Sequence, residues 1–246
     1  VGGYKDLLPY LVRRLLENGA NTSFIHQLKT KDFDILKLVQ SPLTKIDKLD
    51  EDKIKKPIEI YGDRKNSKGL DLSEEDVVDS LKFNGKFKDI KAYSLINGED
   101  VKSDEVIDIK SPHSSTTLGK KYFADEKISE AAIESLKEYS SKWKKFPIEK
   151  KVEIFLKFAD LIEENTNDII EICAKESGKS IKNSIAEIRE AVDFCRYYSK
   201  EALNLFQTQT LKGPTGELNQ YRMIGKGLSF VISPWNFPVA IFVGQT

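Results

Sequence analysis

A single amide side chain, Asn236, stands between two aromatic residues and two prolines in the stretch SPWNFP. The apolar, strand-like run LSFVI at 228–232 leads directly into this stretch. An asparagine N–H at the end of a strand can donate a hydrogen bond to an oxyanion that develops during catalysis. Pro234 and Pro238 stiffen the backbone on either side and would help to hold the amide in position. A buried turn asparagine explains the pattern equally well, so the physical chemistry leaves both interpretations open.

A second candidate site lies near the start of the chain, on a helix expected from about Asp6 to Asn18 and ended by Gly19. Polar residues with helical spacing share one stripe of this helix: Tyr10, Arg13, Arg14 and Glu17. Two adjacent guanidinium groups beside a phenol could hold a carboxylate through paired hydrogen bonds. A solvated helix face with an Arg–Glu pair is the simpler interpretation, and spacing alone favours it.

Three other features resemble catalytic or binding motifs, but their context argues against those roles. The stretch SGKS at 177–180 resembles a phosphate-binding loop, but that loop needs glycine where Cys173 stands, and it follows a strand, not a helix. Cys173 and Cys195 lie in isoleucine-rich helical stretches, which favours buried packing thiols over nucleophiles. His26 and His113 are too far apart for metal-ligand spacing, so no metal site is expected.

The composition narrows the class of protein. The 246 residues contain 39 Lys+Arg and 39 Asp+Glu, and this balance gives nothing to attract nucleic acid or an anionic membrane surface. No apolar run approaches the roughly 20 residues that span a bilayer. Two cysteines imply no disulfide framework and fit a reducing compartment, so we expect a cytoplasmic protein. The chain begins on Val1 without a targeting pattern, and we expect it to be a piece of a longer polypeptide.

The first half of the chain must position the amino-terminal stripe and connect it to the rest. Residues 29–90 are rich in Lys and Asp and carry turn signals, which predicts a linker with short ordered pieces. The stretch AYSLINGEDV turns at Asn97 and Gly98, so it predicts a β-hairpin. VIDIKSP at 106–112 predicts a further strand.

Helices dominate the expected structure from about residue 127 to residue 208. Three long helices each repeat apolar residues on one face, which are Ala132, Leu136, Tyr139 and Trp143 in the first, Val152, Phe155, Ala159 and Ile162 in the second, and Ile181, Ile185, Ile188, Val192, Cys195, Ala202 and Leu205 in the third. A short helix between the second and third ends at Gly178. These patterns predict amphipathic helices, each with one apolar face.

The carboxyl-terminal segment must deliver Asn236. A turn at 213–217 is followed by two strand candidates at 219–225 and 227–233, and a helix with Pro238 in its first turn is expected after the SPWNFP stretch. The order strand, loop, helix N-terminus is where α/β folds place ligand contacts.

These motifs resemble a known family. ISPWNFPVAIF resembles the Pro-Trp-Asn-Phe-Pro motif of the aldehyde dehydrogenase superfamily. Other stretches follow that family's amino-terminal half in the expected order, namely INGE at 96–99, Trp143, FADLIEEN at 158–165 and KESGKS at 175–180. The stretch 213–245 is most similar to the L-glutamate γ-semialdehyde (pyrroline-5-carboxylate) dehydrogenase half of the bifunctional proline utilisation A flavoenzymes. LPYLVRRLLENGANTSF at 8–24 resembles the last helix of their proline dehydrogenase barrel.

The resemblance implies an α/β fold made of parts. Residues 1–28 would be the carboxyl-terminal remnant of a proline dehydrogenase barrel, and residues 29–90 a linker. Residues 91–246 would be the amino-terminal, incomplete portion of an aldehyde dehydrogenase-like fold, with a helical bundle and the start of a Rossmann-like sheet.

The resemblance also implies roles for individual residues. Asn236 would stabilise the oxyanion of the thiohemiacetal formed from the aldehyde substrate. The residues that would line the nicotinamide cofactor are Ile232, Ser233, Pro234 and Trp235. Tyr10, Arg13 and Arg14 would bind proline, with the two arginines on its carboxylate. Glu17 is a weaker candidate, as a support for the arginines.

By resemblance, the parent enzyme oxidises proline with FAD to pyrroline-5-carboxylate, which hydrolyses to the semialdehyde that NAD then oxidises to glutamate. The family's nucleophilic cysteine and general-base glutamate would lie beyond residue 246, so we expect the chain alone to be inactive. Proline and the semialdehyde are the expected substrates of the parent. A homo-oligomer or a complementing chain is a possible partner, whereas no nucleic-acid-binding domain or membrane association is expected.

Two alternatives stay open at this point. In the first, the chain is a non-catalytic piece that complements a split enzyme or mediates its oligomerisation. In the second, it is a truncated monofunctional aldehyde dehydrogenase. The helix with Tyr10, Arg13 and Arg14 argues against the second alternative, because such an enzyme has no reason to carry it.

Overall fold

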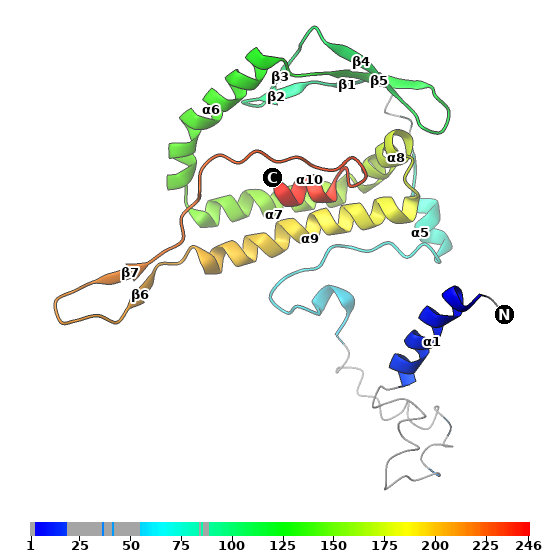
Figure 1. The fold of residues 1–246 in the computed structure, drawn as a ribbon, viewed down its shortest axis with the longest axis horizontal. Coiled ribbons are helices and arrows are strands. Elements are labelled where there is room, and N and C mark those ends of the chain that lie inside the picture. Colours follow the sequence, from blue (N-terminus) through cyan, green and yellow to red (C-terminus); the bar gives the residue numbers. More distant parts are fainter. Residues whose placement is uncertain (1–2, 19–35, 37–40, 42–54, 84, 86–88) are drawn as a thin grey trace. The chain divides into compact units, whose positions relative to one another are not determined.

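The computed structural model describes residues 3–18, 36, 41, 55–83, 85 and 89–246 (Figure 1). The chain forms two compact units, Val1–Ile54 and Lys55–Thr246, and each is described by itself. The predicted domain boundaries after residues 28 and 90 stay predictions.

The described part of the first unit is mainly one helix, α1 (Tyr4–Asn18). It begins two residues before the predicted start, where the Leu7 N–H donates to the Gly3 carbonyl at 3.0 Å. Pro9 lies inside the helix and has no N–H to donate, so one bond of the helical ladder is missing. Gly19, which was predicted to end the helix, lies outside the described residues, as does His26.

The second unit contains short strands between residues 90 and 122. A three-stranded sheet has the order β1 (Ile90–Ala92), β5 (Thr117–Tyr122), β4 (Val106–Lys110), with β1 parallel and β4 antiparallel to β5. The predicted hairpin is confirmed as β2 (Ser94–Ile96) and β3 (Glu99–Val101). Its turn residues Asn97 and Gly98 have φ of 55° and 81°, and positive φ at both centres matches the twist of a two-residue hairpin. The strand predicted at 106–112 is β4.

Four consecutive helices confirm the predicted bundle: α6 (Glu126–Lys145), α7 (Ile148–Glu164), α8 (Thr166–Ser177) and α9 (Ile181–Leu205). Helix α9 is the central element, and α7, α8 and α10 (Ala240–Gln245) all pack on it (Figure 1). The core combines part of the predicted faces of α7 and α9 with residues of α8 and consists of Ala159, Ile162, Ile170, Ile185, Ile188, Ala191, Val192 and Cys195. Phe155, Ile181 and Leu205 of the predicted faces are exposed. In contrast, α6 has no fully buried residue, and Leu136 and Tyr139 of its predicted face are exposed.

The described part of the predicted linker is bound to this bundle. It contains a 3-10 turn, η2 (Pro57–Glu59), and the short helix α5 (Glu75–Ser80). The Ser67 N–H and hydroxyl donate to the two carboxylate oxygens of Asp193 on α9, both at 2.8 Å. Three leucines that follow pack against the core, namely Leu70, Leu72 and Leu81.

Arg196 joins α7, α9 and this bound segment. Its side chain is 4% exposed and donates to both carboxylate oxygens of Glu163 at 3.0 and 2.8 Å, to Asp160 at 2.8 Å and to the Asn66 carbonyl at 3.0 Å. The Lys68 N–H also donates to Glu163, at 2.7 Å. Burial by itself raises the pKa of Glu163, but the hydrogen bonds from Arg196 and Lys68 outweigh burial and leave that pKa below its ordinary value.

Two expectations for the carboxyl-terminal segment are wrong. The turn at 213–217 does form and joins a hairpin of β6 (Gln209–Leu211) and β7 (Asn219–Tyr221). However, β7 covers only the first three residues of the strand predicted at 219–225. The strand predicted at 227–233 does not form. A strand needs a neighbour for its backbone N–H and C=O groups, and no described strand pairs with this segment. Its apolar side chains are therefore exposed, Phe230 at 90%.

The final helix also differs from expectation. Helix α10 begins at Ala240, so Pro238 precedes it and does not lie in its first turn. Among the described residues, no helix combines the length and the apolar character that crossing a membrane requires.

Candidate active site

Asn236 lies in a turn that presents it to solvent. The Phe237 N–H donates to the Pro234 carbonyl at 3.2 Å, which places Trp235 and Asn236 at the centre of the turn. Both residues are exposed, Trp235 at 79%. The interpretation of Asn236 as a buried turn residue therefore does not describe this structure, and its role as a hydrogen-bond donor stays a prediction.

A buried carboxylate fixes the backbone directly after this turn. Glu187 on α9 is 2% exposed, and one of its oxygens accepts hydrogen bonds from the Val239 N–H at 3.2 Å and the Ala240 N–H at 2.9 Å. These N–H groups stand at the start of α10, where a helix has no partners of its own for them. A carboxylate of α9, distant in sequence, thus supplies the hydrogen-bond acceptor at the start of α10.

Lys179 completes this arrangement. Its ammonium group donates to the other oxygen of Glu187 at 2.9 Å, and it lies 5.2 Å from the centre of the Phe237 ring. The ion pair compensates the burial of both charges, and the ring gives the ammonium a further favourable contact. Lys179 therefore contacts the turn residue Phe237 directly and the helix start through Glu187.

The SGKS stretch is a joint between two helices. Gly178 ends α8 with φ of 67°, a left-handed conformation that glycine adopts without strain. Ser180 begins α9, and its side chain accepts a hydrogen bond from the Asn183 N–H. Because a helix precedes it, the rejection of a phosphate-binding loop is confirmed. The joint places Lys179 between the two helices, beside Glu187.

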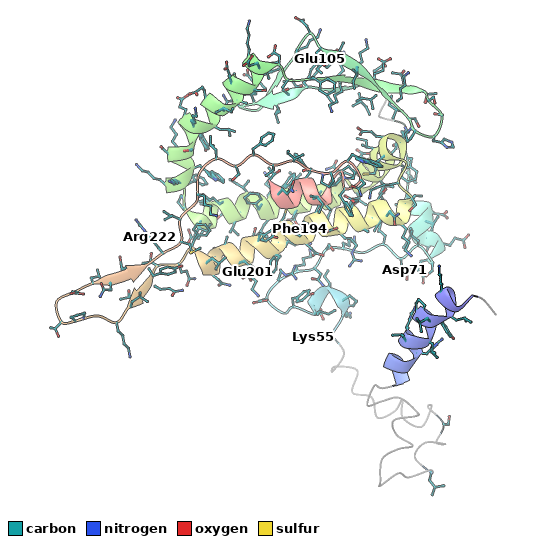
Figure 2. All side chains as sticks on the ribbon, viewed as in Figure 1. Lys55, Asp71, Glu105, Phe194, Glu201 and Arg222 are labelled. Carbon is teal, nitrogen blue, oxygen red and sulfur yellow. The ribbon has the colours of Figure 1, made fainter. Side chains whose placement is uncertain are left out.

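Close packing holds α10 against α9. A methyl group added at Gly244 would lie 2.7 Å from the Phe194 ring, so a larger residue would force the ring or the helix to shift. Phe194 lies on α9 (Figure 2). Val243 of α10 and Val239, which directly precedes this helix, also pack against the core. The backbone that follows Asn236 is therefore immobilised by packing as well as by hydrogen bonds.

The segment predicted to line a nicotinamide ring precedes the turn. Ile232 and Trp235 are exposed apolar residues, and Ser233 donates from its hydroxyl to the Gln245 amide oxygen at 3.1 Å. Ligand pockets are lined mostly by apolar side chains with a few polar groups. The composition of 232–235, which includes Pro234, fits one wall of such a pocket.

The cysteines have the environment of packing residues. Cys173 is 2% exposed, and burial, together with the nearby negative charge of Glu187, raises its pKa to about 11. Burial likewise raises the pKa of Cys195. Both thiols are free and buried, and a raised pKa is unsuitable for a nucleophile. Within the described ranges, no group of three His, Cys, Asp or Glu side chains is placed to hold a metal ion.

The stripe on α1 is present in the first unit. The Arg14 Nε donates to the Tyr10 hydroxyl at 3.1 Å, and the guanidinium carbon lies 5.2 Å from the Tyr10 ring centre. Arg13 is exposed beside them. The Glu17 side chain lies outside the described residues. A carboxylate site at the two arginines stays a prediction.

Sequence reasoning missed Glu187 and Lys179 as site residues. A usable signal was present, since Glu187 lies beside the apolar stripe of Ile185 and Ile188, and a buried acid there requires a partner. The partners themselves, at 179, 239 and 240, could not be read from local spacing.

Comparison with known proteins places this arrangement in a family. The aldehyde dehydrogenase family model matches residues 99–246, and the chain belongs to that family of oxidoreductases, so the predicted fold class is confirmed. The proline dehydrogenase family model matches residues 1–27.

The relatives confirm the predicted branch. The chain is 35% identical over its whole length to the bifunctional protein PutA of Escherichia coli (strain K12), of which it spans 19%. It is similar to the structure of proline utilization A from Bdellovibrio bacteriovorus inactivated by N-propargylglycine, with a TM-score of 0.70 and 29% identity over 96% of this chain and 25% of that one. It is also similar to 1-pyrroline-5-carboxylate dehydrogenase from Thermus with bound NAD, with a TM-score of 0.69 and 27% identity over 74% of this chain and 36% of that one.

Proposed function

We propose that the Asn236 turn is one wall of an aldehyde-oxidising site, with the Asn236 amide as a hydrogen-bond donor to the oxyanion. The observation that carries this proposal is the contrast at the turn, where the side chain is exposed and the following backbone is pinned to α9 through Glu187. A donor that is already in place needs no reorganisation when the charge develops, and this is what makes such donors effective.

The substrate and cofactor are inferred from the relatives. Proteins named PutA and 1-pyrroline-5-carboxylate dehydrogenase indicate L-glutamate γ-semialdehyde as the aldehyde and NAD as the hydride acceptor. Ile232, Ser233, Pro234 and Trp235 would then face the nicotinamide, and Asn236 would hold the substrate oxygen.

The α1 stripe belongs to a separate half-reaction in this proposal. Because residues 1–27 match the proline dehydrogenase model, we assign Tyr10, Arg13 and Arg14 to the proline site of an FAD-dependent reaction. The two guanidinium groups would hold the substrate carboxylate. This match also argues against a truncated monofunctional aldehyde dehydrogenase.

The chain by itself does not complete either reaction. Burial raises the pKa of both cysteines, so we infer that neither is the nucleophile, and the family resemblance assigns the nucleophilic cysteine and the general-base glutamate to polypeptide beyond residue 246. The free thiols suit a cytoplasmic location.

Two assays of the isolated chain test this statement. One mixes it with proline and a dye that accepts electrons, and the other with L-glutamate γ-semialdehyde and NAD. We expect no turnover in either assay. Turnover in either assay that co-purifies with the chain would overturn the proposal. If the NAD-linked turnover then disappeared in a Cys173→Ser or Cys195→Ser variant, that thiol would be the nucleophile.

A second candidate function is complementation of a separate chain. The observation that favours it is exposed apolar surface, in the unpaired segment 228–235 and on α7 at Ile154, Phe158 and Leu161. A partner that supplies the neighbouring strand would cover the first of these surfaces. Co-purification of the chain with a separately expressed aldehyde dehydrogenase-like chain that carries the nucleophile tests this function, and separate elution of the two chains would contradict it.

A further inference from the structure

We propose that Glu187 is the positioning residue of Asn236 and that Lys179 holds Glu187 in that role. This inference rests on the proposed function of Asn236. Glu187 does not reach the substrate in this account; it acts through the backbone that links α10 to the turn.

The hydrogen bonds of Glu187 leave little freedom on the α10 side. One carboxylate oxygen accepts a hydrogen bond from the Lys179 ammonium at 2.9 Å. The other accepts from the N–H groups of Val239 and Ala240 at 3.2 and 2.9 Å. A carboxylate that is 2% exposed is costly to bury unless it is paired in this way. The charge is therefore retained in the core at a place where it fixes a particular stretch of backbone.

That stretch connects directly to the candidate donor. Ala240 is completely buried, and only three residues separate it from Asn236. Phe237, the first of these three, has its ring against the Lys179 ammonium. The ion pair consequently contacts the chain immediately after Asn236 and again at the start of α10.

The position of Glu187 on α9 also matters for rigidity. Helix α9 carries much of the core, and α10 packs closely against it where Gly244 meets the Phe194 ring. The turn is thus connected to the buried core of the unit, and a preorganised donor requires such support.

A matched control is available on the neighbouring helix. Glu171 on α8 is 4% exposed and is paired with Lys175, so it is also a buried acid with a lysine partner. Its pairing lies within α8, whereas the N–H groups of Val239 and Ala240 bond to Glu187. A general effect of disturbing buried charge should appear in Glu171→Gln, and a positioning effect should not.

The first experiment measures amide resonances of the chain by two-dimensional nitrogen–proton NMR. In Glu187→Ala we expect shifted resonances for the Val239 and Ala240 backbone and for the Asn236 side-chain amide, and in Glu187→Gln we expect partial rescue because one acceptor oxygen remains. Lys179→Met keeps the Glu187 carboxylate as acceptor, so we expect smaller shifts of the same resonances. It also serves as the test if Glu187→Ala does not fold.

The outcomes of this experiment decide the proposal. An Asn236 side-chain resonance that is unchanged in a folded Glu187→Ala or, failing that, in Lys179→Met would overturn it. The same shifts in Glu171→Gln as in Glu187→Gln would also overturn it, because the effect would then be general.

A second experiment separates this inference from the proposed function. In an aldehyde-oxidising polypeptide that carries this sequence, kcat is measured for Glu187→Gln, Asn236→Ala and the double variant. We expect about a tenfold lower kcat for Glu187→Gln with little change in KM, and no further loss when it is added to Asn236→Ala, since the two act through one group. Unchanged kcat in Asn236→Ala contradicts the proposed function. If the double variant instead loses kcat by the product of the two single losses, only the positioning role of Glu187 is contradicted.

Discussion

Helices α1 and α10 each border a candidate binding site, but they differ in what fixes the site residues. On α1, Arg14 and Tyr10 lie one turn apart and contact each other, and every residue whose burial is described is exposed. Beside α10, the backbone after Asn236 is bound to Glu187, which lies 53 residues before Ala240 in the sequence. The comparison teaches that local spacing can assemble a group of suitable side chains, whereas preorganisation comes from long-range contacts with a core.

The largest effect is expected where the second unit depends on a buried charge. Arg196→Met removes the cation between Glu163 and Asp160 and leaves their carboxylates without it, which should lower the free energy of unfolding by about 3–5 kcal/mol. Lys150→Met is the matched control, because its pair with Glu153 is exposed and should contribute at most about 1 kcal/mol. Urea unfolding followed by circular dichroism measures both. Similar losses in the two variants would show that the second unit does not depend on this buried cation.

A smaller effect is expected from crowding the contact between α10 and α9. Gly244→Ala places a methyl group 2.7 Å from the Phe194 ring and should cost about 1–3 kcal/mol as the helix is displaced. Gly225→Ala has open space around it and serves as the control. Thermal unfolding and hydrogen exchange of the Val239 and Ala240 amides report the difference. Unchanged exchange in Gly244→Ala would contradict the claim that this contact holds the helix.

Glu163 makes the second unit sensitive to acid. Its pKa is lower in the folded chain than in the unfolded one, so its contribution to stability is complete above the unfolded pKa of about 4.3 and is lost as pH falls through the folded pKa. We expect Glu163→Gln to lose less stability than the unmodified chain between pH 7 and pH 3, as measured by Tm. Parallel pH dependences would show that the hydrogen bonds from Arg196 and Lys68 do not lower this pKa.

The smallest effect is expected on α1. Tyr10→Phe removes the hydroxyl that accepts from Arg14 but keeps the ring, and such a local pair on an exposed helix contributes only about 0.2–0.5 kcal/mol. The helicity of α1, followed through its amide chemical shifts, should fall slightly. A large loss of helicity would contradict the comparison, because α1 would then depend on this pair as strongly as α10 depends on Glu187.

Local signals in the sequence were sufficient for much of the second unit. Asn97 and Gly98 predicted the hairpin because both residue types tolerate the positive φ values that a two-residue hairpin turn needs. Apolar periodicity predicted α7 and α9 because one face of each is buried. The same reasoning failed at 227–233. That segment has the composition of a strand, but pairing depends on a neighbour that local composition cannot provide.

The candidate site was predicted only in part for a related reason. The SPWNFP stretch identified Asn236, since its residue types and the family resemblance are visible in the sequence. Glu187 was not identified, because its place beside the apolar stripe of its helix indicates burial but does not point to partners 52 and 53 residues away. Ser67 and Asp193 were missed for the same reason, being 126 residues apart.

The most direct test of the central claim is the kcat for oxidation of L-glutamate γ-semialdehyde by a polypeptide that carries this sequence and turns over. Removing one preorganised oxyanion donor typically costs a factor of about 10²–10³, so Asn236→Ala should lower kcat by that amount with a much smaller change in KM. Ser229→Ala, an exposed polar residue of the same segment, is the control and should leave kcat unchanged. A kcat for Asn236→Ala within a factor of about two of the unmodified protein would contradict the assignment of Asn236 as the oxyanion donor.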